Sequence, residues 1–256
     1  MTRVHDKLIL ITGASSGIGA ACARRFAAEG AHLILWARRR DRLDVLAGEL
    51  SRAHGIKVRV DQVDVRDRAA VDASARTALA AGPAPDVLIN NAGLASGLSL
   101  VQEGDLEDWD RMIDTNLKGL LFVTRALLPA MIARGRGHVV NIGSTAGHQV
   151  YQKGNVYNAT KFAVKALTEG INLDVAGTPI RDSSVDPGFV ETEFSLVRFH
   201  GDAARAKTTY QGFRALSADD VADTISYVVN LPEHVNILDL ILVPSAQRSV
   251  HLVDRK

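Results

Sequence analysis

Short runs of apolar residues alternate along this chain with longer stretches in which apolar residues return every three or four positions. The short runs predict β-strands. They span residues 7–12, 32–37, 57–65, 86–92, 138–144 and 237–243. The first, second and fourth runs are apolar nearly throughout, which is typical of strands in a parallel sheet whose two faces are covered by helices.

The longer stretches predict α-helices between the strands. They span residues 17–29, 41–53, 67–81, 106–133, 155–175 and 217–230. This alternation builds β-α-β units with right-handed crossovers, so we expect an α/β fold, a Rossmann-type doubly wound parallel sheet of about seven strands. Residues 1–256 show no linker or repeat and predict a single domain. Residues 189–215 interrupt the alternation and are long enough to form a lid over a site.

Composition narrows the class of protein. The chain is 46% hydrophobic, and 30 Lys+Arg against 29 Asp+Glu leave a net charge of +1. This balance argues against nucleic acid or an anionic membrane as the main partner. Residues 1–7 do not resemble a signal peptide, and no apolar run approaches ~20 residues, so we expect a cytoplasmic protein without a membrane span.

Metal-ligand patterns are not evident in the sequence. Cys22 is the only cysteine, which excludes a disulfide framework and a cysteine metal cluster. The eight histidines show no metal-ligand spacing with one another or with carboxylates. We therefore predict no metal.

A glycine-rich turn, "TGASSGIG" (12–19), lies between the first strand and the first helix. Its glycines, Gly13, Gly17 and Gly19, allow a tight turn and a close approach of a pyrophosphate to the backbone. The following helix N-terminus favours the negative charge of that group. The alternative is an ordinary loop, but the position between strand and helix favours a dinucleotide site.

Three arginines follow the second strand. NAD-binding folds place a carboxylate about 20 residues after the glycines, where it binds the ribose 2′-hydroxyl. Here Ala37 lies 18 residues after Gly19, and Arg38 and Arg39 follow it. A guanidinium in place of a carboxylate suits a 2′-phosphate, so we predict NADP(H) rather than NAD(H).

The alternative for these arginines is a solvated helix start. We adopt that interpretation for Arg40 and for Arg42, which we expect to pair along its own helix.

The candidate catalytic residues lie at and after the end of the fifth strand. Tyr157 and Lys161 are four residues apart on a predicted helix and share one face of it. Ser144 ends the fifth strand, 13 residues before Tyr157. Ligands bind at the carboxyl ends of strands in open α/β sheets, which would bring the three side chains to one site.

Together these motifs resemble the short-chain dehydrogenase/reductase family. The resemblance covers nearly the whole chain. It rests on "TGASSGIG", "NNAG" (90–93), Asn116 in "DTNLKG", Ser144, "YNATK" (157–161) and "DPG" (186–188), which follow the family's order.

The resemblance implies a catalytic set. Tyr157 would act as general acid in reduction and as base in oxidation, Ser144 would bind the substrate oxygen, and Asn116 would hold a water for proton relay. Lys161 would hold the nicotinamide ribose, and its charge would lower the pKa of Tyr157. Besides Tyr157, Lys161, Arg38 and Arg39, the implied cofactor contacts are Gly13, Ser15, Ser16, Gly17, Ile18, Gly19, Asp64, Val65, Asn91, Ala92, Gly93, Pro187, Gly188, Val190 and Thr192.

Further stretches, above all "TEFSLVRFHGD" (192–202), resemble NADP-dependent 3-hydroxy acid dehydrogenases, which oxidise L-serine, L-allo-threonine and 3-hydroxy acids and reduce malonic semialdehyde. A carboxylate substrate needs a cation, and Arg198 is the candidate because a guanidinium can bind a carboxylate with two hydrogen bonds. The alternative for Arg198 is a salt bridge within or between subunits. Besides Ser144 and Tyr157, His148 is a second candidate for a substrate contact, with loop packing as its alternative.

One segment departs from this pattern. Residues 178–188 should hold the sixth strand, which is apolar in relatives, yet they contain Asp182 and Ser183. Either the strand begins late, near Ser184, or Asp182 has a polar partner.

Two other functions compete with a 3-hydroxy acid dehydrogenase. One is an NADPH-dependent reductase of another aldehyde or ketone, such as a clavulanate-type aldehyde. The other is a non-catalytic NADP(H)-binding regulator, against which the intact Ser144, Tyr157 and Lys161 argue. The family resemblance also implies a homotetramer.

Overall fold

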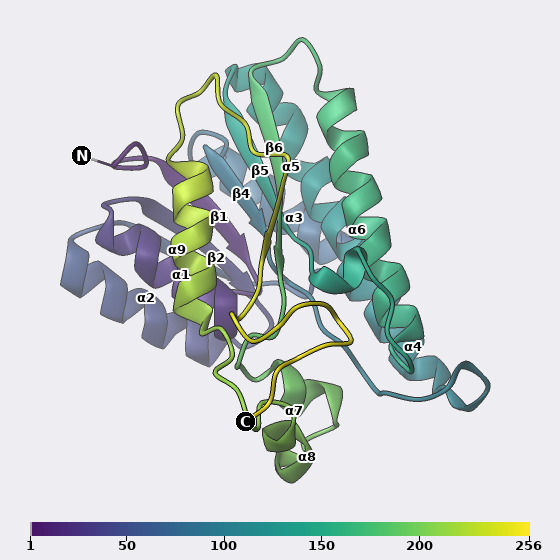
Figure 1. Ribbon diagram of the computed structural model, residues 1–256. Helices are drawn as coiled ribbons and strands as arrows, with labels where there is room; N and C mark the ends of the chain where they lie inside the picture. The colour runs from purple at the N-terminus through teal and green to yellow at the C-terminus, as the bar shows by residue number, and fades with distance from the viewer. Residues whose placement is uncertain (1) are drawn as a thin grey trace.

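The computed structural model describes residues 2–256 and shows a parallel sheet of seven strands between two layers of helices (Figure 1). The strands are β1 (Leu8–Thr12), β2 (His32–Ala37), β3 (Val58–Gln62), β4 (Val87–Asn90), β5 (Gly137–Ile142), β6 (Ile180–Pro187) and β7 (Asp239–Leu242). The helices are α1 (Gly17–Ala28), α2 (Arg40–His54), α3 (Arg68–Ala81), α4 (Leu106–Ile113), α5 (Leu120–Arg134), α6 (Asn155–Asp174), α7 (Phe194–Arg198), α8 (Ala203–Thr208) and α9 (Ala218–Val229).

Both faces of the sheet are covered, as the apolar strands predict. Helices α1, α2 and α9 pack on one face, and α3, α5 and α6 on the other (Figure 1). Side chains alternate along a strand, so Ile9 and Ile11 of β1 join the first core and Leu10 joins the second. The predicted α/β fold and the positions of its strands and helices are confirmed.

The strand order places a crevice at the centre of the sheet. It runs β3-β2-β1-β4-β5-β6-β7, so the chain leaves β1 toward one edge and returns beside it as β4. Loops at the carboxyl ends of β1 and β4 diverge there, which is where doubly wound sheets bind ligands.

β6 begins at Ile180 despite its polar residues, so the late start near Ser184 is wrong. It pairs with β5 from Gly137↔Ile180 to Ile142↔Val185. The Asp182 side chain is fully buried, and its Oδ1 accepts a hydrogen bond of 3.2 Å from Asn141 Nδ2. The alternative interpretation, a polar partner for Asp182, is confirmed.

The predicted helix over 106–133 is one continuous run with a π-helical turn inside it. Leu106–Arg134 is continuous, but Asp114–Gly119 between α4 and α5 is π-helical. Such turns often occur at functional sites. By length and composition alone this run could cross a membrane, yet Val123, Leu127 and Met131 are buried against the sheet.

The segment 189–215 contains two short helices, α7 and α8, beyond the carboxyl end of the sheet (Figure 1). The C-terminal residues lie beside it, since Lys256 N donates to Gly212 O. A segment in this position can cover a site at the strand ends, as the sequence predicts.

Candidate active site

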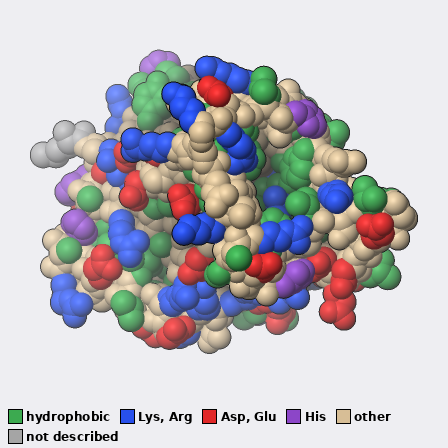
Figure 2. All heavy atoms as spheres, turned by 60° about the horizontal axis from the view of Figure 1, so that its bottom comes forward, with side chains coloured by type: hydrophobic (Ala, Val, Ile, Leu, Met, Phe, Trp, Pro, Cys, Tyr) green, Lys and Arg blue, Asp and Glu red, His purple; other side chains and the backbone are tan. Residues whose placement is uncertain are grey.

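A cavity of about 430 Å³ opens at the carboxyl ends of the strands. Figure 2 looks onto this end of the molecule and shows a hollow with hydrophobic side chains inside it and Lys or Arg side chains around it. Loops after β1, β2, β3, β4, β5 and β6 line the cavity, and residues of α7 close one side. Its volume lies within the range of small-molecule and cofactor sites.

The glycine-rich turn forms one wall. Gly13 and Gly17 have φ of 66° and 51°, in the left-handed region that favours glycine. A Cβ on Gly19 would lie 2.5 Å from Asn91 Nδ2, so a larger residue would break the contact between this turn and the end of β4. The first backbone amides of α1 lie at this wall and can bind a phosphate.

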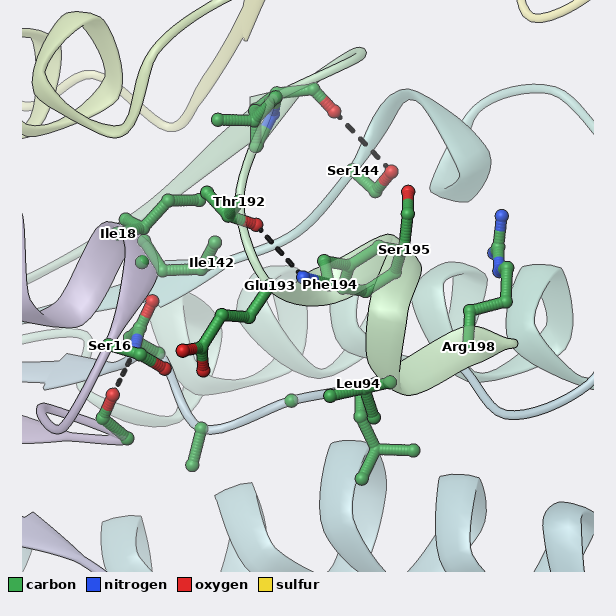
Figure 3. A pocket seen from close by; sticks show the side chains of 18 of the residues that line it. Ser16, Ile18, Leu94, Ile142, Ser144, Thr192, Glu193, Phe194, Ser195 and Arg198 are labelled. Atoms are coloured by element: carbon green, nitrogen blue, oxygen red, sulfur yellow. Dashed lines mark hydrogen bonds between the residues drawn. The ribbon is translucent and has the colours of Figure 1, made fainter. Parts of the chain in front are cut away.

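Arg39 joins this turn to α7. Its guanidinium donates to Ser15 Oγ (3.1 Å), Ser16 Oγ (2.6 Å) and Glu193 Oε2 (2.9 Å). In Figure 3 the Glu193 carboxylate, at the start of α7, points toward Ser16. Arg38 also lines the cavity. The two hydroxyls of the glycine-rich turn and the guanidinium that follows β2 form a donor set suited to a phosphate, and the sequence predicts the 2′-phosphate here.

Arg40 and Arg42 form ion pairs with different parts of the molecule. Arg40 pairs with Asp44 along α2, at 2.8 Å, as predicted. Arg42 instead reaches Glu193 Oε1 at 2.7 Å, so its expected pairing along the helix is wrong. Arg42 and Arg39 together lower the pKa of Glu193, because both guanidiniums favour the ionised carboxylate.

Most other predicted cofactor residues also line the cavity. Asp64 does so while its carboxylate accepts from Arg66, which lowers the pKa of Asp64. Gly19 is absent from the lining and acts through its contact with Asn91. The further predicted residues at the cavity wall are Ile18, Val65, Asn91, Ala92, Gly93, Pro187, Gly188, Val190 and Thr192.

Ser144, Tyr157 and Lys161 meet in the same cavity, each less than one tenth exposed. Lys161 Nζ lies 5.9 Å from the centre of the Tyr157 ring and donates to Ile142 O at 2.8 Å. The Ser144 hydroxyl donates to Pro187 O at 3.4 Å (Figure 3). Residues from β5, the start of α6 and the end of β6 thus converge on one point.

The pKa of Tyr157 is shifted in the direction opposite to the one that the sequence predicts. Burial raises the pKa of Tyr157, and Arg198 and the Ser144 hydroxyl oppose that rise, whereas the sequence predicts a lowered pKa caused by Lys161. Burial also lowers the pKa of Lys161 to about 8, opposed by Asp186. Desolvation disfavours the charged forms of both groups and outweighs their nearby charges here.

Asn116 lies in the π-helical turn and connects two parts of the site. Its Nδ2 donates to Leu94 O (2.8 Å) and to Thr160 Oγ1 (3.0 Å), and its Oδ1 accepts from Leu94 N (2.8 Å). The side chain therefore holds the loop after β4 against α6. It does not cap its own helix.

Arg198 of α7 reaches the catalytic group from the lid. Its Nη2 donates to Tyr151 Oη at 2.6 Å, and its guanidinium lies 5.0 Å from the centre of the Tyr157 ring. Its buried Nε has no hydrogen-bond partner. Within residues 2–256 no carboxylate forms a salt bridge with Arg198 (Figure 3). Arg198 therefore lines the cavity with a positive charge that no carboxylate of the described residues pairs with.

His148 is absent from the cavity lining, which corrects the expected substrate contact. Its Nε2 faces both Asp186 and Asp239 and is hydrogen-bonded to the buried Asp186 carboxylate. That carboxylate holds the imidazole behind the cavity wall. Loop packing, the alternative interpretation, describes its position better.

Several lining residues carry no signal in the sequence. Tyr210 Oη lies 2.7 Å from Ser195 Oγ and donates to Val190 O at 3.0 Å. Gln247 Oε1 accepts from Phe189 N at 3.0 Å. They come from the lid and the C-terminal segment, whose places depend on tertiary contacts, so no local pattern could identify them.

Comparisons with known proteins agree with this geometry. Residues 7–201 match the family model described as short chain dehydrogenase. An NADP-dependent 3-hydroxy acid dehydrogenase of Salmonella typhi is 45% identical over 241 residues, covering 94% of this chain and 96% of the relative. A sulfoacetaldehyde reductase of Chromohalobacter salexigens is 45% identical, covering 97% and 98%. The closed form of a serine dehydrogenase complexed with NADP⁺ superposes with a TM-score of 0.89 at 43% identity, covering 97% of this chain and 99% of that one.

Proposed function

Because the chain belongs to the short chain dehydrogenase family, we propose that it transfers a hydride between NADP(H) and a small 3-hydroxy acid or its carbonyl counterpart. L-Serine, L-allo-threonine and 3-hydroxypropionate with malonic semialdehyde are the candidate substrates. The guanidinium of Arg198 carries this proposal, because it has no carboxylate partner within residues 2–256 and places a positive charge in the cavity, 5.0 Å from the centre of the Tyr157 ring.

The preference for NADP(H) is supported by the end of β2. Ala37 provides no carboxylate for a ribose 2′-hydroxyl, and Arg38 and Arg39 lie at the cavity beside the hydroxyls of Ser15 and Ser16. A relative at 45% identity is named NADP-dependent. The glycine-rich turn and the start of α1 would hold the pyrophosphate, and Asp64 and the loop after β4 would hold the adenosine.

Side chains of this protein would transfer the proton that accompanies the hydride. NADP(H), when bound, supplies or accepts the hydride. Tyr157 would donate its hydroxyl proton to the substrate oxygen in reduction and accept a proton in oxidation. Ser144 would donate a hydrogen bond to the same oxygen as negative charge develops. The Lys161 ammonium would favour the phenolate of Tyr157, and Asn116 would hold a water that exchanges the proton with solvent.

Arg198 would orient the substrate by its carboxylate. Its guanidinium is held by Tyr151 through Nη2, which leaves Nε without a partner in the protein. A carboxylate can accept hydrogen bonds from a guanidinium in a planar, paired geometry. The guanidinium carbon also lies over the rings of Tyr157 and Phe194, 5.0 Å and 5.2 Å from their centres.

A sulfonate aldehyde is the second candidate substrate, because a relative at 45% identity is a sulfoacetaldehyde reductase. A sulfonate also presents oxygens to Arg198, so this residue suits both anions. Carbonyl compounds without an anionic group, including clavulanate-type aldehydes, would not use Arg198 in this way.

A substrate panel tests the proposal. NADP⁺ reduction is measured with L-serine, L-allo-threonine, 3-hydroxyisobutyrate, 3-hydroxypropionate, isethionate and simple secondary alcohols. We expect the hydroxy acids to react fastest, and Arg198→Ala to raise their KM about 10- to 100-fold, because a hydrogen-bonded charge is lost. The KM for a simple alcohol should not change.

Other outcomes of the substrate panel would contradict the 3-hydroxy acid assignment or favour a different function. Reaction only with uncharged alcohols, or an unchanged KM for hydroxy acids in Arg198→Ala, contradicts the 3-hydroxy acid assignment. Faster reaction of isethionate than of every hydroxy acid favours the sulfonate. No turnover with any compound, combined with tight NADPH binding, favours a regulator. Tyr157→Phe, which removes the acid but keeps the ring, is the inactive control.

We also propose a single domain, residues 1–256, that works in the cytoplasm as a homotetramer. Leu121 of α5 and Phe162 of α6 are apolar and about 40% exposed on the same layer of helices. A partner subunit would cover such side chains.

A further inference from the structure

Asp186 is a buried carboxylate directly behind the catalytic group. It lies near the end of β6 and is 1% exposed. A side chain on Gly143 would overlap its Oδ1, so the carboxylate packs against the backbone between Ile142 and Ser144. Ser184 Oγ donates to the same oxygen. The proposed roles of Tyr157, Lys161 and Ser144 do not use this charge.

His148 binds the other oxygen of Asp186 in a defined orientation. The Nδ1 atom of His148 lies 3.5 Å from Lys165 Nζ. An ammonium only donates hydrogen bonds, so Nδ1 accepts, Nε2 carries the proton, and Nε2–H donates to Asp186 Oδ2. Lys165 thereby fixes the tautomer that supports the carboxylate.

The network continues from His148 to the surface. Asp239 Oδ2 of β7 lies 3.7 Å from His148 Nε2 and 3.9 Å from Lys165 Nζ. The exposed fraction rises from 1% for the Asp186 side chain through 16% for His148 to 35% for Asp239. The path thus leads from a buried carboxylate through an imidazole to a partly exposed carboxylate beside Lys165.

Asp186 acts on Lys161 through the backbone that both contact. Lys161 Nζ donates to Ile142 O, one residue before Gly143. Lys161 has no direct ion pair within residues 2–256. Asp186 is the charge that opposes the effect of burial on the pKa of Lys161, which lies at about 8. Its charge therefore favours the ammonium that the proposed mechanism needs.

We propose that the His148–Asp186 pair is a positioning unit of the catalytic centre, which fixes a negative charge behind Ser144 and keeps Lys161 protonated during turnover. Three elements bring groups toward Asp186. These groups are His148 from the loop after β5, Lys161 and Tyr157 from α6, and Asp239 from β7, beside the Ser184 hydroxyl of β6 itself. Lys165 of α6 contacts His148 and Asp239. This inference rests on the proposed oxidoreductase activity and does not depend on which alcohol is the substrate.

The direction of the pH effect follows from the contacts. Burial, together with the neighbouring Asp239 carboxylate, raises the pKa of Asp186, and the hydrogen bonds from Ser184 and His148 oppose that rise. Without the His148 donor, the pKa of Asp186 rises further, and Lys161 loses part of its supporting charge. Lys161 then deprotonates at lower pH. The alkaline limb of the activity profile, where Lys161 loses its proton, moves to lower pH.

Two substitutions at His148 test the predicted shift of the alkaline limb. The kcat for alcohol oxidation by the intact enzyme is measured from about pH 6 to about pH 10 with saturating NADP⁺, using the fastest alcohol. We expect His148→Leu to move the alkaline limb down by about one pH unit. His148→Gln keeps an N–H near the position of Nε2 and should restore the original profile. Gln149→Leu, next to His148 and outside the pair, is the matched control and should leave the profile unchanged.

Lys165→Gln is a second variant that tests the same shift of the pH profile, and it keeps the proposal testable if His148→Leu does not fold. It replaces the ammonium donor to Nδ1 by a shorter, uncharged amide at a partly exposed position and should move the limb in the same direction by a smaller amount. Unchanged profiles in His148→Leu, or in Lys165→Gln when His148→Leu does not fold, overturn the proposal. Equal shifts in His148→Leu and His148→Gln do so too.

A metal is the remaining competitor at this cluster. One ligand atom each from His148, Asp186 and Asp239 lies within 4.8 Å of the others, a spacing that a divalent cation could also use. The Lys165 ammonium already supplies positive charge there. Full activity after EDTA treatment supports the hydrogen-bonded pair, and loss of activity that Zn²⁺ or Mn²⁺ restores overturns it. Lack of turnover by the unmodified enzyme would instead contradict the proposed function.

Discussion

At the scale of single residues, position decides what identical side chains do. The arginines after β2 are consecutive, yet Arg39 lies in the cavity between Ser16 and Glu193 while Arg40 pairs with Asp44 on the surface of α2. The difference arises because α2 begins at Arg40. Arg39 precedes the helix and faces the glycine-rich turn, whereas Arg40 follows the helical surface.

This contrast gives a matched test of cofactor preference. We expect Arg39→Ala to raise the KM for NADP⁺ about 10- to 100-fold, because a charged hydrogen bond to the 2′-phosphate is lost. The KM for NAD⁺, which has no such phosphate, should stay nearly constant. Initial-rate kinetics with both cofactors measure this, and Arg40→Ala is the control with an unchanged ratio. Tighter binding of NAD⁺ than of NADP⁺ by the unmodified protein would refute the assignment of Arg39.

At the scale of elements, β6 shows how a strand with polar residues can be central in a sheet. Asn141 of β5 donates to Asp182, and His138 of β5 meets Ser183 at 2.8 Å on the opposite face. Burial nevertheless raises the pKa of Asp182 to about 8, and its Oδ2 has no partner in the described chain. The strand is held by its pairing with β5 and β7, and Asp182 weakens it when ionised.

Stability should therefore depend on pH through Asp182. The unfolded chain releases this proton near the ordinary pKa of 3.8, and the folded protein keeps it until about 8. The unfolded state binds fewer protons between these values, so the contribution of Asp182 to the free energy of unfolding falls as pH rises from 3.8 to about 8.

Asp182→Asn removes this penalty. We expect it to raise the free energy of unfolding by roughly 1–3 kcal/mol at pH 8 and to have little effect near pH 4. Urea denaturation at both values measures the difference. The exposed Asp219→Asn should show no such dependence on pH. A destabilised Asp182→Asn at pH 8 would mean that the ionised carboxylate has a partner that stabilises it.

At the scale of the whole molecule, the lid completes the site and the outer helices leave apolar surface. The α7 segment provides both Glu193, which holds Arg39, and Arg198, which reaches Tyr157, so it joins the cofactor and substrate ends of the cavity. On the outside, Leu121 and Phe162 remain exposed. Subunit association is the proposed reason.

The oligomeric state tests this directly. We expect the unmodified protein to sediment as a tetramer and Phe162→Asp to sediment as a smaller species, because a charge in an apolar interface is strongly unfavourable. Val45→Asp changes an equally apolar but 72% exposed residue on α2, across the sheet from α6, and should leave the mass unchanged. A single-chain mass for the unmodified protein would contradict the tetramer.

The sequence by itself determined the order of strands and helices, the turn at Gly13 and the shared helix face of Tyr157 and Lys161. These features depend on local rules: side-chain periodicity, the backbone freedom of glycine and the four-residue repeat of a helix. Each can be read from a short window of residues.

Only the tertiary structure decided the partners of the charged side chains. Glu193 lies 154 residues from Arg39, and Asp186 lies 38 residues from His148. The Asn141 partner of Asp182 also depends on strand pairing. Such contacts are set by how the sheet brings distant strand ends together, and a buried charge takes whichever partner that packing provides. Local pattern therefore identified the residue types of the site, and the fold determined which of them face the cavity.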